Sequence, residues 1–182
     1  MLFPGGRLPL RIFEQRYMDM AKRCLKDGSP FGVCAIREGN EVGAPAVPYD
    51  VGTLARIADW DMPQLGLLEV VALAGERFRI VKRHAERSGL QLAQVELLQS
   101  EADAPVPDGC AACVRLLERL IEQHPGLLPE PHRLDSASWI GARLAELLPL
   151  PLPERQALLE LDDPAERLAR LTLRIRGSRA GA

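Results

Sequence analysis

Apolar and polar side chains alternate in short runs over the first hundred residues, and a period of two is typical of strands. In residues 7–12, Leu8, Leu10 and Ile12 fall on one face of an extended segment. Pro9 falls on the opposite face and cannot donate a hydrogen bond to a neighbouring strand. We therefore expect this strand at a sheet edge or at a bulge.

From Phe13 onward the apolar spacing lengthens to that of a helix. The apolar stripe of this helix consists of Tyr17, Met20, Ala21, Cys24 and Leu25. Gly28 is placed to end it, because glycine readily adopts the left-handed conformation that closes many helices. The sequence thus predicts one early helix directly after the first strand.

Further strands are expected at residues 31–36, 52–59, 65–73, 77–80 and 90–98. The run at 65–73 is almost continuously apolar, which favours a buried central strand. Gly75 and Glu76 are expected to break the chain after it. The alternation slips near Leu92 and Ala93, which indicates a bulge. Several short strands with one helix favour a compact, partly closed β-barrel.

The rest of the chain has a helical pattern. A polar, proline-bearing linker is expected at residues 101–108. Helix starts are then marked by Asp108, by Asp135 or Ser136, by Pro153 and by Asp163. We therefore predict an α+β fold with a barrel subdomain at 1–100, the linker at 101–108 and a helical bundle at 109–182.

Composition and charge narrow the functional classes. The chain has 182 residues, is 47% hydrophobic and carries a formal net charge of −2. That charge creates no general attraction for nucleic acid or an anionic membrane, so neither partner is expected. The sequence has no run of 18 apolar residues and no basic-then-apolar leader, so we expect a cytoplasmic protein.

Two cysteines form the motif that most resembles a reactive site. Cys110 and Cys113 are spaced as in redox and zinc motifs. A zinc site needs two further ligands, and the spacing of His124 and His132 does not match the usual pattern. We favour a structural interpretation, in which both thiols lie on the buried stripe of a helix, and we expect no metal and no cofactor.

Other polar residues also have a structural interpretation. His84 is expected in an exposed hairpin loop beside basic residues. Arg167, Arg170 and Arg174 share a helix face, and a solvated face is favoured over a nucleic-acid patch because the chain has few aromatic residues. None of these residues forms an arrangement that supports catalysis.

One stretch resembles a known family. The segment LFPGGRLPLRIFEQRY, residues 2–17, closely resembles the signature at the start of the Lon protease N-terminal domain. Weaker matches follow in the same order as in that family, at residues 52–57 (GTLARI), 75–80 (GERFRI), 142–150 (ARLAELLPL) and 163–168 (DPAERL). The family normally has one more apolar strand about ten residues before this signature. Either the true start lies upstream, or the barrel lacks that strand.

The resemblance implies a fold and a function. It implies a PUA-like barrel followed by a helical bundle, in a stand-alone domain that handles protein substrates without chemistry of its own. A Walker A loop needs a lysine after glycine, and none of Lys22, Lys26 and Lys82 follows one. No lysine lies far enough downstream of a serine for a Ser-Lys protease dyad. We therefore expect neither ATPase nor peptidase activity.

Two hypotheses remain open. The first is a non-catalytic module that binds unfolded or partly unfolded protein segments, as an adaptor in protein quality control beside a protease or chaperone. Its candidate peptide contacts are Arg11, Phe13, Glu14, Arg16 and Tyr17, although Glu14 and Arg16 also have a structural interpretation at a helix start. The second hypothesis is a PUA-like RNA-binding protein.

Overall fold

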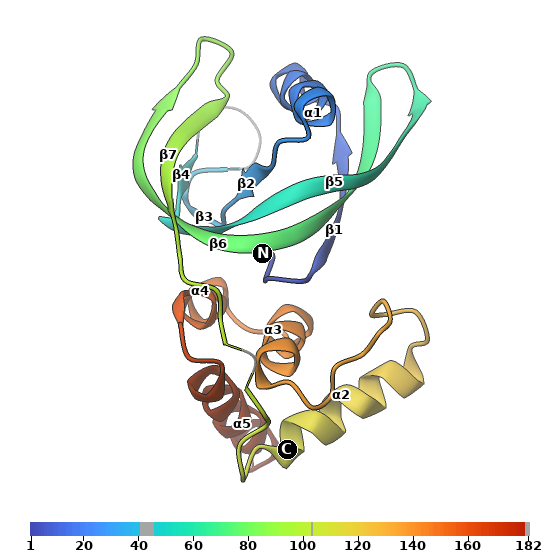
Figure 1. Ribbon diagram of the computed structural model, residues 1–182, viewed down its shortest axis with the longest axis vertical. Helices are drawn as coiled ribbons and strands as arrows, with labels where there is room; N and C mark the ends of the chain where they lie inside the picture. The colour runs from blue at the N-terminus through green and yellow to red at the C-terminus, as the bar shows by residue number, and fades with distance from the viewer. Residues whose placement is uncertain (41–45, 103, 181–182) are drawn as a thin grey trace. The chain divides into compact units, whose positions relative to one another are not determined.

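The computed structural model describes residues 1–40, 46–102 and 104–180, with the backbone alone for 178–180. The chain divides into two compact units, Met1–Gln99 and Ser100–Ala182, and each unit is described by itself. The first unit contains the strands and one helix, and the second contains the remaining helices (Figure 1).

The first unit is built on one antiparallel sheet. Its strands are β1 (Arg7–Ile12), β2 (Phe31–Val33), β5 (Val51–Gln64), β6 (Leu67–Ala85) and β7 (Gln91–Leu97). They pair in the order β1-β6-β5-β2, and β7 pairs with β6 beyond the end of β1. A separate two-stranded sheet joins β3 (Ile36–Glu38) and β4 (Val47–Pro48). The described strands therefore form an open, curved sheet, and the barrel is not closed.

The first strand lies at a sheet edge, as Pro9 predicts. β1 pairs only with β6, in a register that sets Pro9 opposite Val71. Proline removes one backbone donor, and an edge strand has a side where that donor is not needed. Ile12 is buried at the end of this strand, and Leu8 and Leu10 are half-buried.

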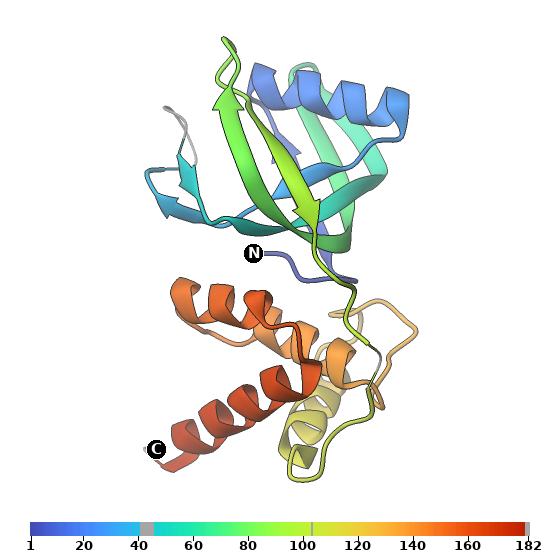
Figure 2. The same ribbon diagram turned by 60° about the vertical axis from the view of Figure 1, so that its left-hand side comes forward.

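Helix α1 (Gln15–Asp27) covers the concave face of the sheet (Figures 1 and 2). Its buried residues Met18, Ala21 and Cys24 pack against sheet residues such as Val70. Gly28 ends the helix with φ 64°, so the predicted stop is confirmed. Burial of this stripe removes the apolar faces of both the helix and the sheet from water, which stabilises the unit.

Several strand predictions were wrong in detail. β6 runs unbroken through Gly75 and Glu76, because the register with β5 shifts there and absorbs one extra residue as a bulge. The bulge between β6 and β7 lies at Val81 and not at Leu92–Ala93. The run at 31–36 is two short strands and not one.

The second unit packs its helices around one central helix. Its elements are α2 (Ala111–Gln123), α3 (Ala137–Leu147), α4 (Leu152–Glu160) and α5 (Pro164–Ala180). α3 is buried along most of its length and contacts the other three helices. The Ser136 hydroxyl accepts a hydrogen bond from the Trp139 amide at 3.2 Å, as a predicted cap should. Among the described residues, no helix combines the length and apolarity needed to cross a membrane.

The start of α2 differs from its prediction. Cys110 occupies the cap position and no side chain caps this helix, so Asp108 does not act as expected. Asp163 does accept a hydrogen bond from the Ala165 amide, at 2.8 Å. Glu166 pairs with Arg170 at 2.6 Å.

The predicted linker contributes to the core of the second unit. The Glu101 carboxylate binds the Arg167 guanidinium through two hydrogen bonds of 2.5 and 2.6 Å, and both side chains are buried. Glu101 also accepts a hydrogen bond from Ser138 at 2.8 Å. The solvated-face prediction is therefore wrong for Arg167, because an ion pair compensates the cost of burying its charge. Arg170 and Arg174 remain exposed.

Candidate functional site

The junction of β1 and α1 holds the five residues that the sequence nominates as peptide contacts. Arg11 is exposed and pairs with Glu69 of β6 at 2.9 Å. Phe13 follows directly, with 63% of its surface exposed between a strand and a helix that are otherwise well packed. An aromatic side chain left in water at such a junction is a candidate contact.

The other three predicted contacts interact with one another and with the rest of the unit. The Arg16 guanidinium is almost fully buried, pairs with Glu14 at 2.8 Å and lies over the Tyr17 ring at 4.7 Å. It also donates to the Gly89 carbonyl at 3.2 Å, which ties α1 to the turn between β6 and β7. Tyr17 packs against the core beside Ile12. A peptide at the junction would meet Arg11 and Phe13 first.

The β5–β6 hairpin contributes exposed apolar residues that sequence reasoning missed. Phe13 follows Ile12, whose partner is Leu68 at the start of β6, so the junction lies beside this hairpin. The side chains are exposed by 54% at Trp60, 40% at Met62 and 99% at Leu65. We group these three residues with Phe13 under the name hairpin-tip patch.

The sequence pattern places these residues at a hairpin tip only in part. Leu65 was assigned to a buried strand, but it lies in the turn before Gly66, whose φ of 86° is typical of a tight turn. In the preceding strand, acidic and apolar residues alternate as Asp59-Trp60-Asp61-Met62. Such alternation normally indicates one buried and one solvated face, so it does not reveal that Trp60 and Met62 are exposed.

The β6–β7 hairpin has the opposite character. Arg79, Lys82, Arg83 and Arg87 are exposed along it and its turn. His84 lies in β6 opposite Leu92, so the loop predicted for it is wrong, although its side chain is exposed as expected. We call Arg79, Lys82, Arg83 and Arg87 the basic cluster.

The cysteine motif is buried. Both thiols are buried, as predicted, but only Cys113 lies on the inner side of α2, because Cys110 is at the cap position before it. The Cys113 sulfur lies 3.2 Å from the Thr172 hydroxyl, and burial raises the pKa of this thiol. A raised pKa disfavours the nucleophilic thiolate. In the described ranges, no three His, Cys, Asp or Glu residues are grouped so as to hold a metal ion.

Comparison with known proteins gives consistent matches. The family model described as the ATP-dependent protease La (LON) substrate-binding domain matches residues 1–176. Lon protease 2 of Myxococcus xanthus is 27% identical over 176 residues, which are 92% of this chain and 21% of that protein. Protein cereblon of Gallus gallus is 28% identical over 101 residues, which are 54% of this chain and 22% of that protein. The chain thus spans about a fifth of the length of these relatives.

Solved structures agree in fold. A Lon N-terminal domain protein from Xanthomonas campestris is 36% identical, with a TM-score of 0.78 over 94% of this chain and 90% of that one. The N-terminal domain of the Mycobacterium avium complex Lon protease gives a TM-score of 0.62 at 16% identity, over 95% of this chain and 90% of that one. The matched regions are substrate-binding or N-terminal domains, and they do not include ATPase or protease modules.

Proposed function

We propose that this chain, which belongs to the family of Lon protease substrate-binding domains, recognises unfolded protein clients and performs no chemistry on them. The observation that carries the proposal is the hairpin-tip patch of Phe13, Trp60, Met62 and Leu65. Exposed apolar side chains cost free energy in water, and they are retained where a partner covers them. Aromatic residues contribute strongly at such interfaces.

The family name supports this interpretation of the patch. A substrate-binding domain must contact segments that are buried in folded proteins and exposed in unfolded ones. Those segments are rich in apolar side chains, and an apolar patch binds them by excluding water. We place this role in the cytoplasm, with the chain acting as an adaptor that presents clients to a protease or a chaperone.

The affinity for one short segment should be modest. The patch is small, and a flexible client loses conformational freedom when it binds, so we expect a Kd of roughly micromolar or weaker. Several weak contacts along one long client should strengthen binding. Chain length should then matter more than the order of apolar residues.

Fluorescence anisotropy with a labelled, permanently unfolded protein tests the proposal. We expect Trp60→Ala and Leu65→Ser each to weaken binding several-fold, because each removes an exposed part of the patch. The matched controls are Leu97→Ala and Val81→Ser, which remove apolar residues exposed by 52% and 66% from the other hairpin. Equal binding of folded and unfolded proteins, or equal loss in the controls, would contradict the assignment.

RNA binding is the second candidate, and the basic cluster is the observation that favours it. Arg79, Lys82, Arg83 and Arg87 lie close along one hairpin of an open sheet, and the PUA-like folds that this family resembles include RNA binders. However, β7 and the Arg79–Ala85 part of β6 contain no aromatic residue on which a base could stack. A mobility shift with single-stranded RNA across a salt series tests this candidate.

A further inference from the structure

The outer side of β5 is open along half of its length. β6 pairs with β5 from Val51 to Gln64 on one side. On the other side β2 pairs only with Thr53, Leu54 and Ala55, and no other strand in the described ranges pairs there. The Arg56 guanidinium donates to the Gly28 carbonyl, so the loop before β2 covers the start of this side. We call residues 57–64 the free edge.

Two aspartate side chains accept hydrogen bonds from backbone amides in this segment. The Trp60 amide donates to the Asp59 carboxylate at 2.9 Å, and the Met62 amide donates to the Asp61 carboxylate at 2.7 Å. Amides two residues apart in a strand point to the same side. Because both amides donate to side-chain carboxylates, and the register with β6 shifts at Ile57/Asp59 and again at Asp61/Gln64, we assign them to the side of β5 away from β6. They are therefore the donors of the free edge.

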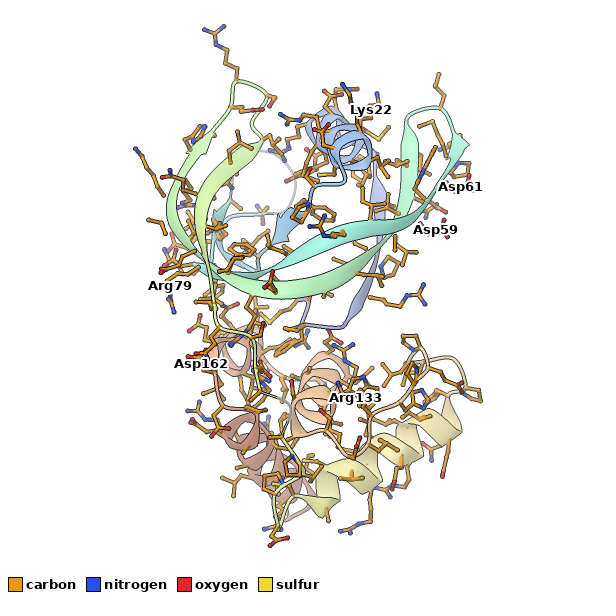
Figure 3. The ribbon with its side chains drawn as sticks, viewed as in Figure 1. Lys22, Asp59, Asp61, Arg79, Arg133 and Asp162 are labelled. Atoms are coloured by element: carbon orange, nitrogen blue, oxygen red, sulfur yellow. The ribbon has the colours of Figure 1, made fainter. Side chains whose placement is uncertain are left out.

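The carboxylates that accept these bonds are themselves exposed. Asp59 and Asp61 lie on the outer side of β5, away from the body of the sheet (Figure 3). An unpaired edge invites another strand, and charged side chains are a common way to prevent indiscriminate pairing. The acidic pair here satisfies the edge donors while no partner strand is present.

The same charges select among partners. In a second copy of this chain, antiparallel edge-to-edge pairing would bring two pairs of carboxylates together, and like charges opposite each other destabilise a sheet. A segment that carries lysine or arginine gains attraction instead. The exposed side chains of Trp60 and Met62, which alternate with the carboxylates, add apolar contact area for the same segment.

We propose that the free edge binds an extended client segment as an added strand, and that it prefers segments in which basic and apolar residues are mixed. The client's carbonyls replace the aspartate oxygens as acceptors for the Trp60 and Met62 amides. The released carboxylates of Asp59 and Asp61 then pair with basic side chains of the client. This inference rests on the proposed client-binding function and specifies its substrate class and mode of binding.

Three labelled twelve-residue peptides test the proposal by fluorescence anisotropy. One alternates lysine with valine and leucine, the second has glutamate in place of lysine, and the third is the basic peptide with its central amides N-methylated. We expect the basic peptide to bind at least about tenfold more tightly than the acidic one, because the edge charges favour it. N-methylation should weaken binding about tenfold, since it prevents strand pairing.

The matched variant is Asp59→Asn with Asp61→Asn. Asparagine keeps an oxygen that can accept the amide hydrogen bond but removes the charge, so the preference for the basic peptide should fall below about threefold. Lys82→Gln with Arg83→Gln changes two charges on the other hairpin and should leave the preference unchanged. Thermal unfolding of both variants checks that they fold, and slower hydrogen exchange of residues 57–64 with the basic peptide bound reports strand addition.

The outcomes separate the two proposals. Equal binding of the basic, acidic and methylated peptides, with a loss in Trp60→Ala, would overturn edge pairing and leave client binding by the apolar patch standing. A charge preference that persists in the double asparagine variant would also overturn it. Absence of binding by every peptide and by long unfolded chains would overturn both the edge proposal and the proposed function.

Discussion

The long strand β6 joins two hairpins whose surfaces differ in charge and in aromatic content. The end that pairs with β5 carries Asp59 and Asp61 beside an exposed tryptophan. The end that pairs with β7 carries the basic cluster, and its one aromatic residue, Phe78, is buried. Figure 3 shows Arg79 on the opposite side of the sheet from Asp59 and Asp61.

The two hairpins have the same kind of backbone pairing, so their different surfaces must come from their side chains. Both are antiparallel, and both contain a bulge in which β6 has one extra residue, although the register of β5 with β6 shifts twice more, at Ile57/Asp59 and Asp61/Gln64. β6 itself cannot distinguish a client from an RNA, because its backbone offers the same kind of pairing at both ends. In our proposal, the side chains and the open side of β5 suit one end to unfolded protein, while the other end carries exposed cations.

The largest effect on stability is expected at Gly52, which lies opposite Phe78 in the part of β6 that both hairpins share. A methyl group at Gly52 would lie 2.5 Å from the Cys34 sulfur, 2.6 Å from the Val33 carbonyl and 2.8 Å from the Phe78 ring. Gly52→Ala should therefore destabilise the first unit by about 3 kcal/mol, because backbone must move to admit the methyl group. Urea unfolding measures this change.

Gly75→Ala is the matched control for that substitution. Gly75 lies in the β5–β6 bulge, where a new methyl group would meet the Leu54 carbonyl at an ordinary 3.6 Å. The free energy of unfolding should change by less than about 1 kcal/mol. A similar loss in both variants would show that close packing at Gly52 is not the cause.

Reversing the charge of one hairpin sharpens the comparison further. Asp59→Lys with Asp61→Lys should reverse the peptide preference, so that the acidic peptide binds about tenfold more tightly than the basic one. Lys82→Glu with Arg83→Glu should not reverse it, because those residues lie at the other hairpin. Anisotropy titrations at low and high salt measure the preference of both variants. A reversal of the preference by the second pair of substitutions would show that peptides bind at the β6–β7 hairpin, which would contradict our assignment.

A smaller effect on stability is expected from the ionisation of Cys34 at high pH. Its thiol lies close to Gly52. Burial, with a smaller contribution from the charge of Asp50, raises the pKa of this thiol from 9.0 to about 11. The unfolded thiol ionises first as pH rises, so its stabilising contribution is complete below pH 9 and is lost between 9 and 11. By pH 10 the loss should be about 1 kcal/mol.

The measurement compares wild type with Cys34→Ser in urea at pH 8 and pH 10. The difference between the two proteins should shrink at the higher pH, because serine does not titrate in this range. Other groups that titrate contribute equally to both proteins and cancel. An unchanged difference would mean that Cys34 ionises as readily in the folded protein as in the unfolded one.

The weakest binding is expected for single-stranded RNA. At about 150 mM salt the basic cluster should give no measurable shift with single-stranded RNA, because exposed charges are screened and no aromatic platform accompanies them. Any retention at low salt should disappear in Lys82→Glu with Arg83→Glu. Tight binding that survives physiological salt would contradict this expectation and favour the RNA candidate over client binding.

The candidate site was only partly predictable from sequence. The resemblance of residues 2–17 to the family signature indicates Phe13 as a candidate contact, and Phe13 is exposed. Trp60 and Met62 were not nominated, and Leu65 was assigned to a buried strand. Apolar residues give the same pattern whether or not another element packs on their face of the sheet, so their exposure depended on the tertiary structure.

What the sequence by itself determined about this protein depends on local backbone chemistry. Pro9 predicts an edge strand because it lacks a donor, Gly28 ends a helix because it tolerates positive φ, and Ser136 caps one because its hydroxyl reaches the next turn. The ordered motifs over most of the chain also determined the family. The backbone signals act within a few residues, and the family motifs are recognised from residue identities and their order alone.

Only the tertiary structure decided which side chains water reaches. Arg167 is buried because Glu101, distant in sequence, meets it in the second unit. The free edge of β5 exists because β2 pairs with only three of its residues, and this exposes the donors that Asp59 and Asp61 cover. Burial and pairing are properties of segments far apart in the chain, so no local pattern could determine them.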